Sequence, residues 1–156
     1  MTVYYMCQAC HSVFDFDTLL KCYSDSNKHT QRAHVAELLV GYPCISVNCY
    51  GELFDIDEVM VKPISKLNNL GIKTLYCCSG HIQNKNIDST YISMVGNIDF
   101  NVVPDDSCLK HESKDGEEIT ILRFNKDLET TVDLFSRWIN LHEWSDLLTK
   151  EMINFL

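Results

Sequence analysis

Apolar residues along the middle of the chain recur at steps of three and four positions. This spacing runs from Asp55 to about residue 70 and predicts an amphipathic helix that Gly71 ends. Asp55 and Glu58 have the spacing of a capping box at its start. Pro63 lies well inside the pattern, where it removes one helical hydrogen bond, so we expect a kink there.

Before this helix the pattern is shorter and more broken. Residues 3–16 contain two short apolar stretches on either side of a Cys-x-x-Cys turn, the shape of a zinc knuckle. Residues 28–40 predict a helix, capped by Ser26 or Asn27 and ended by Gly41. The segment "YPCISVNCYGELFD" then places a second cysteine pair in a loop followed by a short strand.

After the central helix, four apolar stretches bounded by polar loops predict antiparallel strands. They cover residues 73–79, 90–96, about 107–112 and 118–124. Asp115 and Gly116 form a tight-turn signal between the last two. Residues 126–142 and 145–156 return to helical spacing, with one stripe at Leu128, Val132, Phe135 and Ile139 and another at Leu148, Met152 and Phe155. This order predicts an α+β fold: an antiparallel sheet with helices on one face.

Composition narrows the class of protein. A chain of 156 residues with 46% hydrophobic and 22% charged residues is typical of one globular domain, or of a small domain with a stapled appendage. No apolar run approaches the ~18 residues that a membrane span needs. The beginning of the chain does not resemble a signal peptide, so we expect a cytoplasmic protein.

The net charge of −9 disfavours binding to a phosphate backbone, so nucleic acid is a weaker candidate partner than a basic protein surface. The acidic excess is concentrated between residues 99 and 118. It comprises Asp99, Asp105, Asp106, Glu112, Asp115, Glu117 and Glu118, set against Lys110 and Lys114. Such a run indicates either a solvated hairpin or a partner-binding patch.

Four of the eight cysteines have the spacing of a metal site. Cys7 and Cys10 are separated by two residues, Cys44 and Cys49 by four, and 33 residues lie between the pairs. Two tight turns that aim two thiolates each at one point suit the tetrahedral preference of Zn²⁺. Because four cysteines close the coordination sphere, the predicted zinc is structural.

Two alternatives to this ligand set remain open. Cys44 and Cys49 could be ordinary buried thiols, or one of the four ligands could be replaced by another residue from the same region. The replacements to consider are His11, Cys22, His29 and His34. The first ~50 residues hold few apolar side chains, and metal binding would supply the missing folding free energy. We therefore predict a zinc-ribbon-like head with an inserted helix over residues 1–54, packed on an α+β domain over residues 55–156.

The stretch "LYCCSGH", residues 75–81, is a second candidate site. Neighbouring strand residues point to opposite faces, so we expect Cys77 in the core and Cys78 on the other side. Cys78, Ser79, Gly80 and His81 lie where the strand opens into a loop and could bind a ligand. Two alternatives are a plain strand end and cysteine chemistry in which His81 activates Cys78. No third catalytic group is indicated by spacing.

The segment "LFDIDEVMVKPISKLNNLGIKTLYCCSGHIQ…TYISMVG" carries a resemblance. It is similar to small proteins of Firmicutes and their phages that join a cysteine-rich head to a helix–strand–"CSGH"–strand core, over roughly residues 44–96. More distantly, "CCSGHI" resembles the "SCSGRI" segment of the tRNA wybutosine-synthesis protein 3 family, which implies methyl transfer to tRNA. Cys78, Ser79, Gly80 and Ile82 match that motif, and His81 stands where the family has Arg.

Together these features favour a zinc-stabilised, non-enzymatic binding protein that recognises a protein or a small ligand. One such role that we expect is that of an accessory or anti-defence factor carried by a phage or mobile element. The alternative is an enzyme that acts on a nucleotide or RNA-related substrate through the loop of Cys78 and His81. A third reading is a zinc-ribbon module that binds nucleic acid. The oligomeric state is left open.

Overall fold

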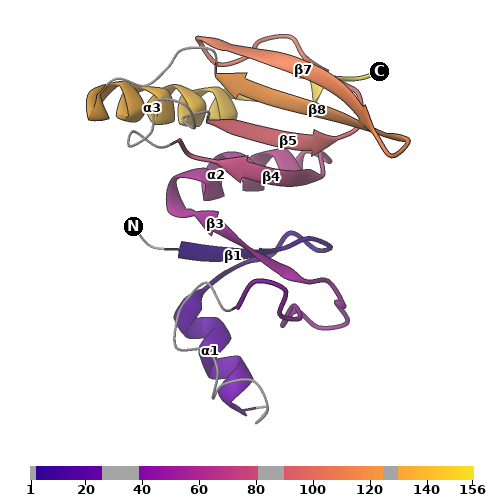
Figure 1. The fold of residues 1–156 in the computed structure, drawn as a ribbon, viewed down its shortest axis with the longest axis vertical. Helices are drawn as coiled ribbons and strands as arrows, with labels where there is room; N and C mark the ends of the chain where they lie inside the picture. The colour runs from indigo at the N-terminus through magenta and orange to yellow at the C-terminus, as the bar shows by residue number, and fades with distance from the viewer. Residues whose placement is uncertain (1–2, 26–38, 81–89, 125–129) are drawn as a thin grey trace. The chain divides into compact units, whose positions relative to one another are not determined.

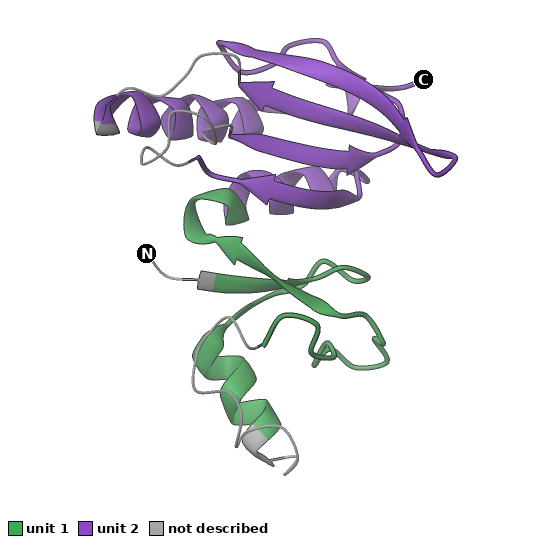
Figure 2. Cartoon of the chain, viewed as in Figure 1, with its two compact units in different colours: residues 1–61 green, residues 62–156 purple. Residues whose placement is uncertain are grey.

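The computed structural model describes residues 3–25, 39–80, 90–124 and 130–156 (Figure 1). The chain divides into two compact units, Met1–Val61 and Lys62–Leu156 (Figure 2). Helices and antiparallel sheets make up both units, so the predicted α+β class is confirmed. Among the described residues, no helix is both long and apolar enough to cross a membrane.

The first unit is built on a three-stranded antiparallel sheet in the order β2-β1-β3. Its strands are β1 (Val3–Cys7), β2 (Val13–Asp15) and β3 (Leu53–Asp57). The helix α1 (Phe16–Asp25) follows β2 directly. Asp15 caps it, because the carboxylate Oδ1 accepts a hydrogen bond from the backbone N–H of Thr18 at 2.7 Å, and this bond lowers the pKa of Asp15.

The core of this unit is small and includes two cysteines. Its buried members are Tyr5, Cys7, Leu19, Tyr23, Leu39, Cys44 and Leu53. The hydroxyl of Tyr23 donates a hydrogen bond to the carbonyl of Pro43, which ties α1 to the loop that carries the second cysteine pair. Burial, together with the nearby Cys44, raises the pKa of Tyr23 to about 12.

In this part of the chain one helix was not predicted, one predicted helix start is wrong, and one predicted helix lies mostly outside the described residues. The sequence did not predict α1, which begins where the second apolar stretch was expected to end. The central helix was expected from Asp55, but β3 continues to Asp57 because it pairs with β1 along its whole length. The helix predicted at 28–40 lies, up to residue 38, outside the described residues.

The helix α2 (Glu58–Asn69) contains Pro63 and ends as predicted at a glycine. Gly71 has a φ of 93°, and the N–H of Ile72 bonds to the carbonyl of Leu67 at 3.0 Å. This is the hydrogen-bond pattern of a Schellman motif, which needs a residue in the left-handed region.

The second unit contains a four-stranded antiparallel sheet in the order β4-β5-β8-β7. The strands are β4 (Thr74–Cys78), β5 (Tyr91–Val95), β7 (Ser107–Lys114) and β8 (Glu117–Phe124). The turn between β7 and β8 is the predicted one, since Asp115 and Gly116 have φ values of 54° and 80°. Two consecutive positive φ values are those of a type I′ hairpin turn.

One face of this sheet is buried and the other is more open. Ile92, Met94 and Leu122 are buried on the first face. The part of α2 that belongs to this unit and α3 both contact residues of that face. Asn68 of α2 accepts hydrogen bonds from the N–H and hydroxyl of Thr74, at 3.2 and 3.1 Å. From α3, the guanidinium of Arg137 lies 4.9 Å from the ring centre of Phe124.

The C-terminal region differs from the prediction of two helices. One helix, α3 (Thr131–Leu147), begins with a capping box between Thr130 and Asp133. A 3-10 turn (η3, Lys150–Met152) and the strand β9 (Ile153–Phe155) follow it, and β9 pairs with β6 (Ile98–Phe100). A partner more than 50 positions away in the sequence thus overrides the helical spacing of residues 153–155.

The side of α3 that is buried is also not the predicted one. The expected stripe residues Val132, Phe135 and Ile139 are 70%, 50% and 57% exposed. The buried residues are instead Leu134, Arg137, Leu141, Trp144 and Ser145. Because α3 carries apolar residues around most of its circumference, spacing alone could not identify the face that packs on the sheet.

Candidate metal centre

The four cysteines singled out by their spacing meet in the first unit. The sulfur atoms of Cys7, Cys10, Cys44 and Cys49 all lie within 4.8 Å of one another. Cys7 Sγ is 3.6 Å from Cys49 Sγ, and Cys10 Sγ is 3.6 Å from Cys44 Sγ. Two sulfurs bound to one Zn²⁺ at about 2.3 Å in a tetrahedron would be about 3.8 Å apart, close to these values.

The first cysteine pair is carried by the turn that leaves β1. Cys7 is the last residue of the strand, and its N–H bonds to the carbonyl of Ser12 at 3.0 Å. The chain reverses over Gln8 to Cys10, and His11 takes a φ of 61° to complete the reversal. This turn brings the sulfur of Cys10 beside that of Cys7.

The second pair is carried by the loop before β3. Asn48, with a φ of 59°, tightens the loop directly before Cys49. The N–H of Cys44 bonds to the carbonyl of Gly51 at 2.8 Å. The N–H of Gln8 bonds to the carbonyl of Glu52 at 3.0 Å, which joins the second loop to the first turn. Backbone hydrogen bonds therefore hold the two cysteine-bearing segments together.

Backbone N–H groups point at two of the sulfurs. The N–H groups of Ala9 and Cys10 lie 3.3 and 3.5 Å from Cys7 Sγ, and that of Ser46 lies 3.4 Å from Cys44 Sγ. Such donors stabilise a thiolate more than a thiol, because they interact with its negative charge. The turns are thus arranged to favour the form of cysteine that binds metals.

The thiols differ in how readily they ionise. Burial raises the pKa of Cys7 to about 12. Burial also opposes ionisation of Cys10, but contacts with Ser12, Ser46 and Cys44 outweigh it and lower the pKa of Cys10 to about 6. Four thiolates this close together would repel strongly, so a cation at their centre is needed if all four are to be charged.

The four cysteine sulfurs are a set of ligands suited to a metal ion. Four sulfur ligands in a tetrahedron select Zn²⁺ or iron over the hard cations that prefer oxygen. The cluster can therefore hold a metal ion, and all four coordination positions would be filled by protein.

The alternative ligands do not join the cluster. Among the described residues, the group that could hold a metal consists of the four cysteines alone, without His11. Cys22 is exposed on α1. His29 and His34 lie outside the described residues.

The second candidate stretch lies in the other unit, at the end of β4. Cys77 pairs with Ile92 and Cys78 with Tyr91, so the two thiols face opposite sides of the sheet, and both are half-buried. A bulge between Thr74 and Cys77 puts these two residues on the same, helix-covered face. Cys78 begins a row across the other face, through Tyr91 and Arg123 to Cys108.

Ser79 and Gly80 are buried rather than open to solvent, and Gly80 has a φ of 99°. The carbonyl of Ser79 accepts hydrogen bonds from the indole N–H of Trp138, at 2.8 Å, and from the hydroxyl of Thr90, at 3.0 Å. His81 lies outside the described residues, so the ligand-binding role of residues 78–81 stays a prediction.

Sequence reasoning missed the residues that surround this strand end. Arg137 is 5% exposed, and its guanidinium donates a hydrogen bond to Thr90 at 3.1 Å. Trp138, the next residue of α3, holds the carbonyl of Ser79. The available signal was an arginine next to the large apolar residues Phe135, Trp138 and Ile139 of a predicted helix, which suggests a buried cation but does not say what it contacts.

Comparisons with protein-family models, with curated proteins and with solved structures found no match to this chain.

Proposed function

We propose that this chain is a zinc-stabilised, non-enzymatic binding protein whose metal is held by Cys7, Cys10, Cys44 and Cys49. The observation that carries the proposal is the convergence of four sulfurs at the separations that one tetrahedral ion requires. Zinc is preferred to iron because closed, tetrahedral four-cysteine sites in small domains are typical of structural zinc.

A structural role for the metal is supported by its surroundings. Cys7 and Cys44 are members of the buried core of the first unit, together with Tyr5 and Leu53. A metal here would join β1 to the loop before β3, and four protein ligands would leave no position for a substrate or a water. The metal would therefore stabilise the unit rather than perform chemistry.

A binding role is preferred to an enzymatic one because the described part of the "CSGH" strand end is buried and hydrogen-bonded. Ser79 is buried, and its carbonyl already accepts two hydrogen bonds from neighbouring side chains. These contacts favour a packed strand end. Exposed apolar side chains on α3, in contrast, offer a surface for another molecule.

Metal analysis tests the central part of this proposal. Native mass spectrometry and elemental analysis of protein purified without added metal should find one zinc ion per chain. A folded, metal-free protein would contradict the proposal, and one iron ion, with a visible absorption band, would replace zinc as the metal.

We also propose a cytoplasmic role as an accessory or anti-defence factor of a phage or mobile element, which rests on the resemblance of residues 44–96. A reducing compartment would keep the four thiols available to the metal. Plaque counts on a host with an active defence system should rise when the chain is expressed and should not rise with Cys7→Ser. Equal counts with and without the chain on a panel of defended hosts would count against this role.

A further inference from the structure

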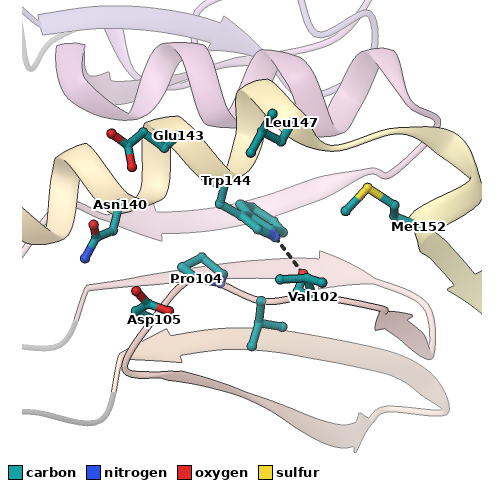
Figure 3. Close-up of a pocket in the computed structure, with 9 residues that line it drawn as sticks. Val102, Pro104, Asp105, Asn140, Glu143, Trp144, Leu147 and Met152 are labelled. Carbon is teal, nitrogen blue, oxygen red and sulfur yellow. Dashed lines mark hydrogen bonds between the residues drawn. The ribbon is translucent and has the colours of Figure 1, made fainter.

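A groove lies beside α3 in the second unit (Figure 3). It has a volume of about 300 Å³. Its lining comprises Val102, Val103, Pro104, Asp105, Asn140, Glu143, Trp144, Leu147 and Met152. These residues come from the segment after β6, from the C-terminal half of α3 and from η3, so only the folded chain forms this groove.

The groove has a rigid wall built around Trp144. Its indole N–H donates a hydrogen bond to the carbonyl of Val102 at 2.7 Å. Its ring meets that of Phe100 edge to face, with centroids 5.3 Å apart. Trp144 is only 6% exposed, so most of its ring packs inside the protein and only a small part of it faces the groove. A surface that is already ordered loses little entropy when a partner binds.

Large apolar side chains remain exposed along and beside the groove. Val102 is 57% and Leu147 is 73% exposed. On the same helix, Val132, Phe135 and Ile139 are also exposed, nearer its N-terminal end. Large exposed apolar side chains beside a groove are typical of an interaction site.

The charges of the groove have one sign. Figure 3 shows Asp105, Asn140 and Glu143 gathered at one end, with Leu147 and Met152 toward the other. Asp105 and Glu143 are exposed, as is the neighbouring Asp106, and none of the lining residues is Lys or Arg. A ligand that combines an apolar part with positive charge therefore complements this groove.

We propose that this groove docks a basic segment of a partner protein, which inserts a large apolar side chain against Trp144 and Leu147 and places Lys or Arg beside Asp105 and Glu143. The inference rests on the proposed binding function and names its partner class and its surface. A second copy of the chain would bring like charges together, and nucleic acid or an anionic membrane would be repelled. A volume of about 300 Å³ is at the lower limit for small-molecule sites, which favours a side chain.

The test begins with a random dodecapeptide phage library selected against the purified, metal-loaded full chain. Enriched peptides should contain a Leu, Ile, Phe or Trp flanked by Lys or Arg. The affinity of a synthetic enriched peptide is then measured for Glu143→Lys combined with Asp105→Lys, and for Leu147→Ser. Matched controls are Glu117→Lys, an exposed charge reversal on β8, and Tyr76→Ser, an exposed aromatic residue on β4 that is 66% exposed.

The expected result is a loss of affinity of at least tenfold in both groove variants and less than twofold in both controls. Raising the salt concentration should also weaken binding, since the charged residues of the groove are exposed. No enrichment, enrichment of acidic peptides, or equal binding by the groove variants would overturn the inference. So would concentration-dependent dimers that Leu147→Ser abolishes, because a second copy would then occupy the groove.

The zinc proposal and the groove inference can fail separately. The zinc content and tryptophan fluorescence of each variant show whether it is loaded and folded. Peptide binding by a chain that carries no metal would remove the zinc proposal and keep the groove. One zinc per chain with no groove-dependent peptide binding would keep the zinc proposal and remove the groove inference.

Discussion

Gly51 packs against the sulfur of Cys7 so closely that a Cβ atom at position 51 would lie 2.5 Å from Sγ. The same Cβ would lie 2.6 Å from the Cβ of Ala9. Such distances are far below van der Waals contact, and the first turn has backbone on that side. The approach of the two cysteine-bearing segments therefore depends on the absence of a side chain at position 51.

Gly51→Ala should weaken the metal site without removing any ligand. We expect the free energy of unfolding of the first unit to fall by about 1–3 kcal/mol, as for other overpacked positions. Competition with a colorimetric zinc chelator should show a lower zinc affinity. Glu52→Ala, at the next and exposed position, is the matched control and should behave like the unmodified chain. Equal zinc affinities for Gly51→Ala and the control would show that the loop relaxes freely.

Replacing a single ligand should have a larger effect. Cys7→Ser or Cys44→Ser should reduce zinc occupancy well below one per chain and remove the ordered amide signals of residues 3–23 and 39–57 from NMR spectra. Metal binding in small zinc peptides supplies about 10–16 kcal/mol, so the loss should exceed that of any apolar truncation. Cys22→Ser, on the exposed side of α1, is the control and should retain both zinc and signals. A folded, zinc-free Cys7→Ser variant would contradict a structural metal.

Removal of the metal should affect the two units differently. Both tryptophans, Trp138 and Trp144, belong to the second unit, so their fluorescence reports on that unit alone. A strong chelator should abolish the near-ultraviolet dichroism of the tyrosines in the first unit and leave tryptophan emission unchanged. Parallel loss of both signals would mean that the second unit also depends on the metal.

Arg137 should be important for the stability of the second unit. It is buried, donates to Thr90 and lies over the ring of Phe124. We expect Arg137→Ala to lower the unfolding free energy by roughly 2–4 kcal/mol, because it removes a hydrogen bond and a cation–π contact and leaves a cavity. Arg123→Ala, at an exposed position of β8, is the comparison and should cost less than about 0.5 kcal/mol. Denaturant titration monitored by tryptophan fluorescence measures both, and equal losses would contradict a special role for Arg137.

Each cysteine pair of the metal cluster was predictable from local spacing, because a tight turn fixes how two cysteines point, whereas the approach of the two pairs depends on long-range contacts such as the hydrogen bond from Gln8 to Glu52. The glycine at position 71 and the Asp115-Gly116 turn were predictable for the same reason, since each reflects the backbone of a few adjacent residues. Tertiary structure decided the rest. Residues 153–155 became a strand because β6 offered a partner, and β3 kept Asp55 out of the helix by pairing with β1.

The difference between local spacing and long-range packing also explains which side of α3 is buried and which is exposed. Its apolar residues surround the helix, so their spacing could not show that Arg137 and Trp144 would face inward while Phe135 and Ile139 stayed exposed. Arg137 and Trp144 face inward because distant parts of the chain accept their hydrogen bonds: Thr90 accepts from Arg137, and Val102 accepts from Trp144. The groove likewise unites Val102, Trp144 and Met152, and no local pattern relates these three positions. The sequence alone therefore determined where a metal can bind, whereas long-range packing determined which surface is left for a partner.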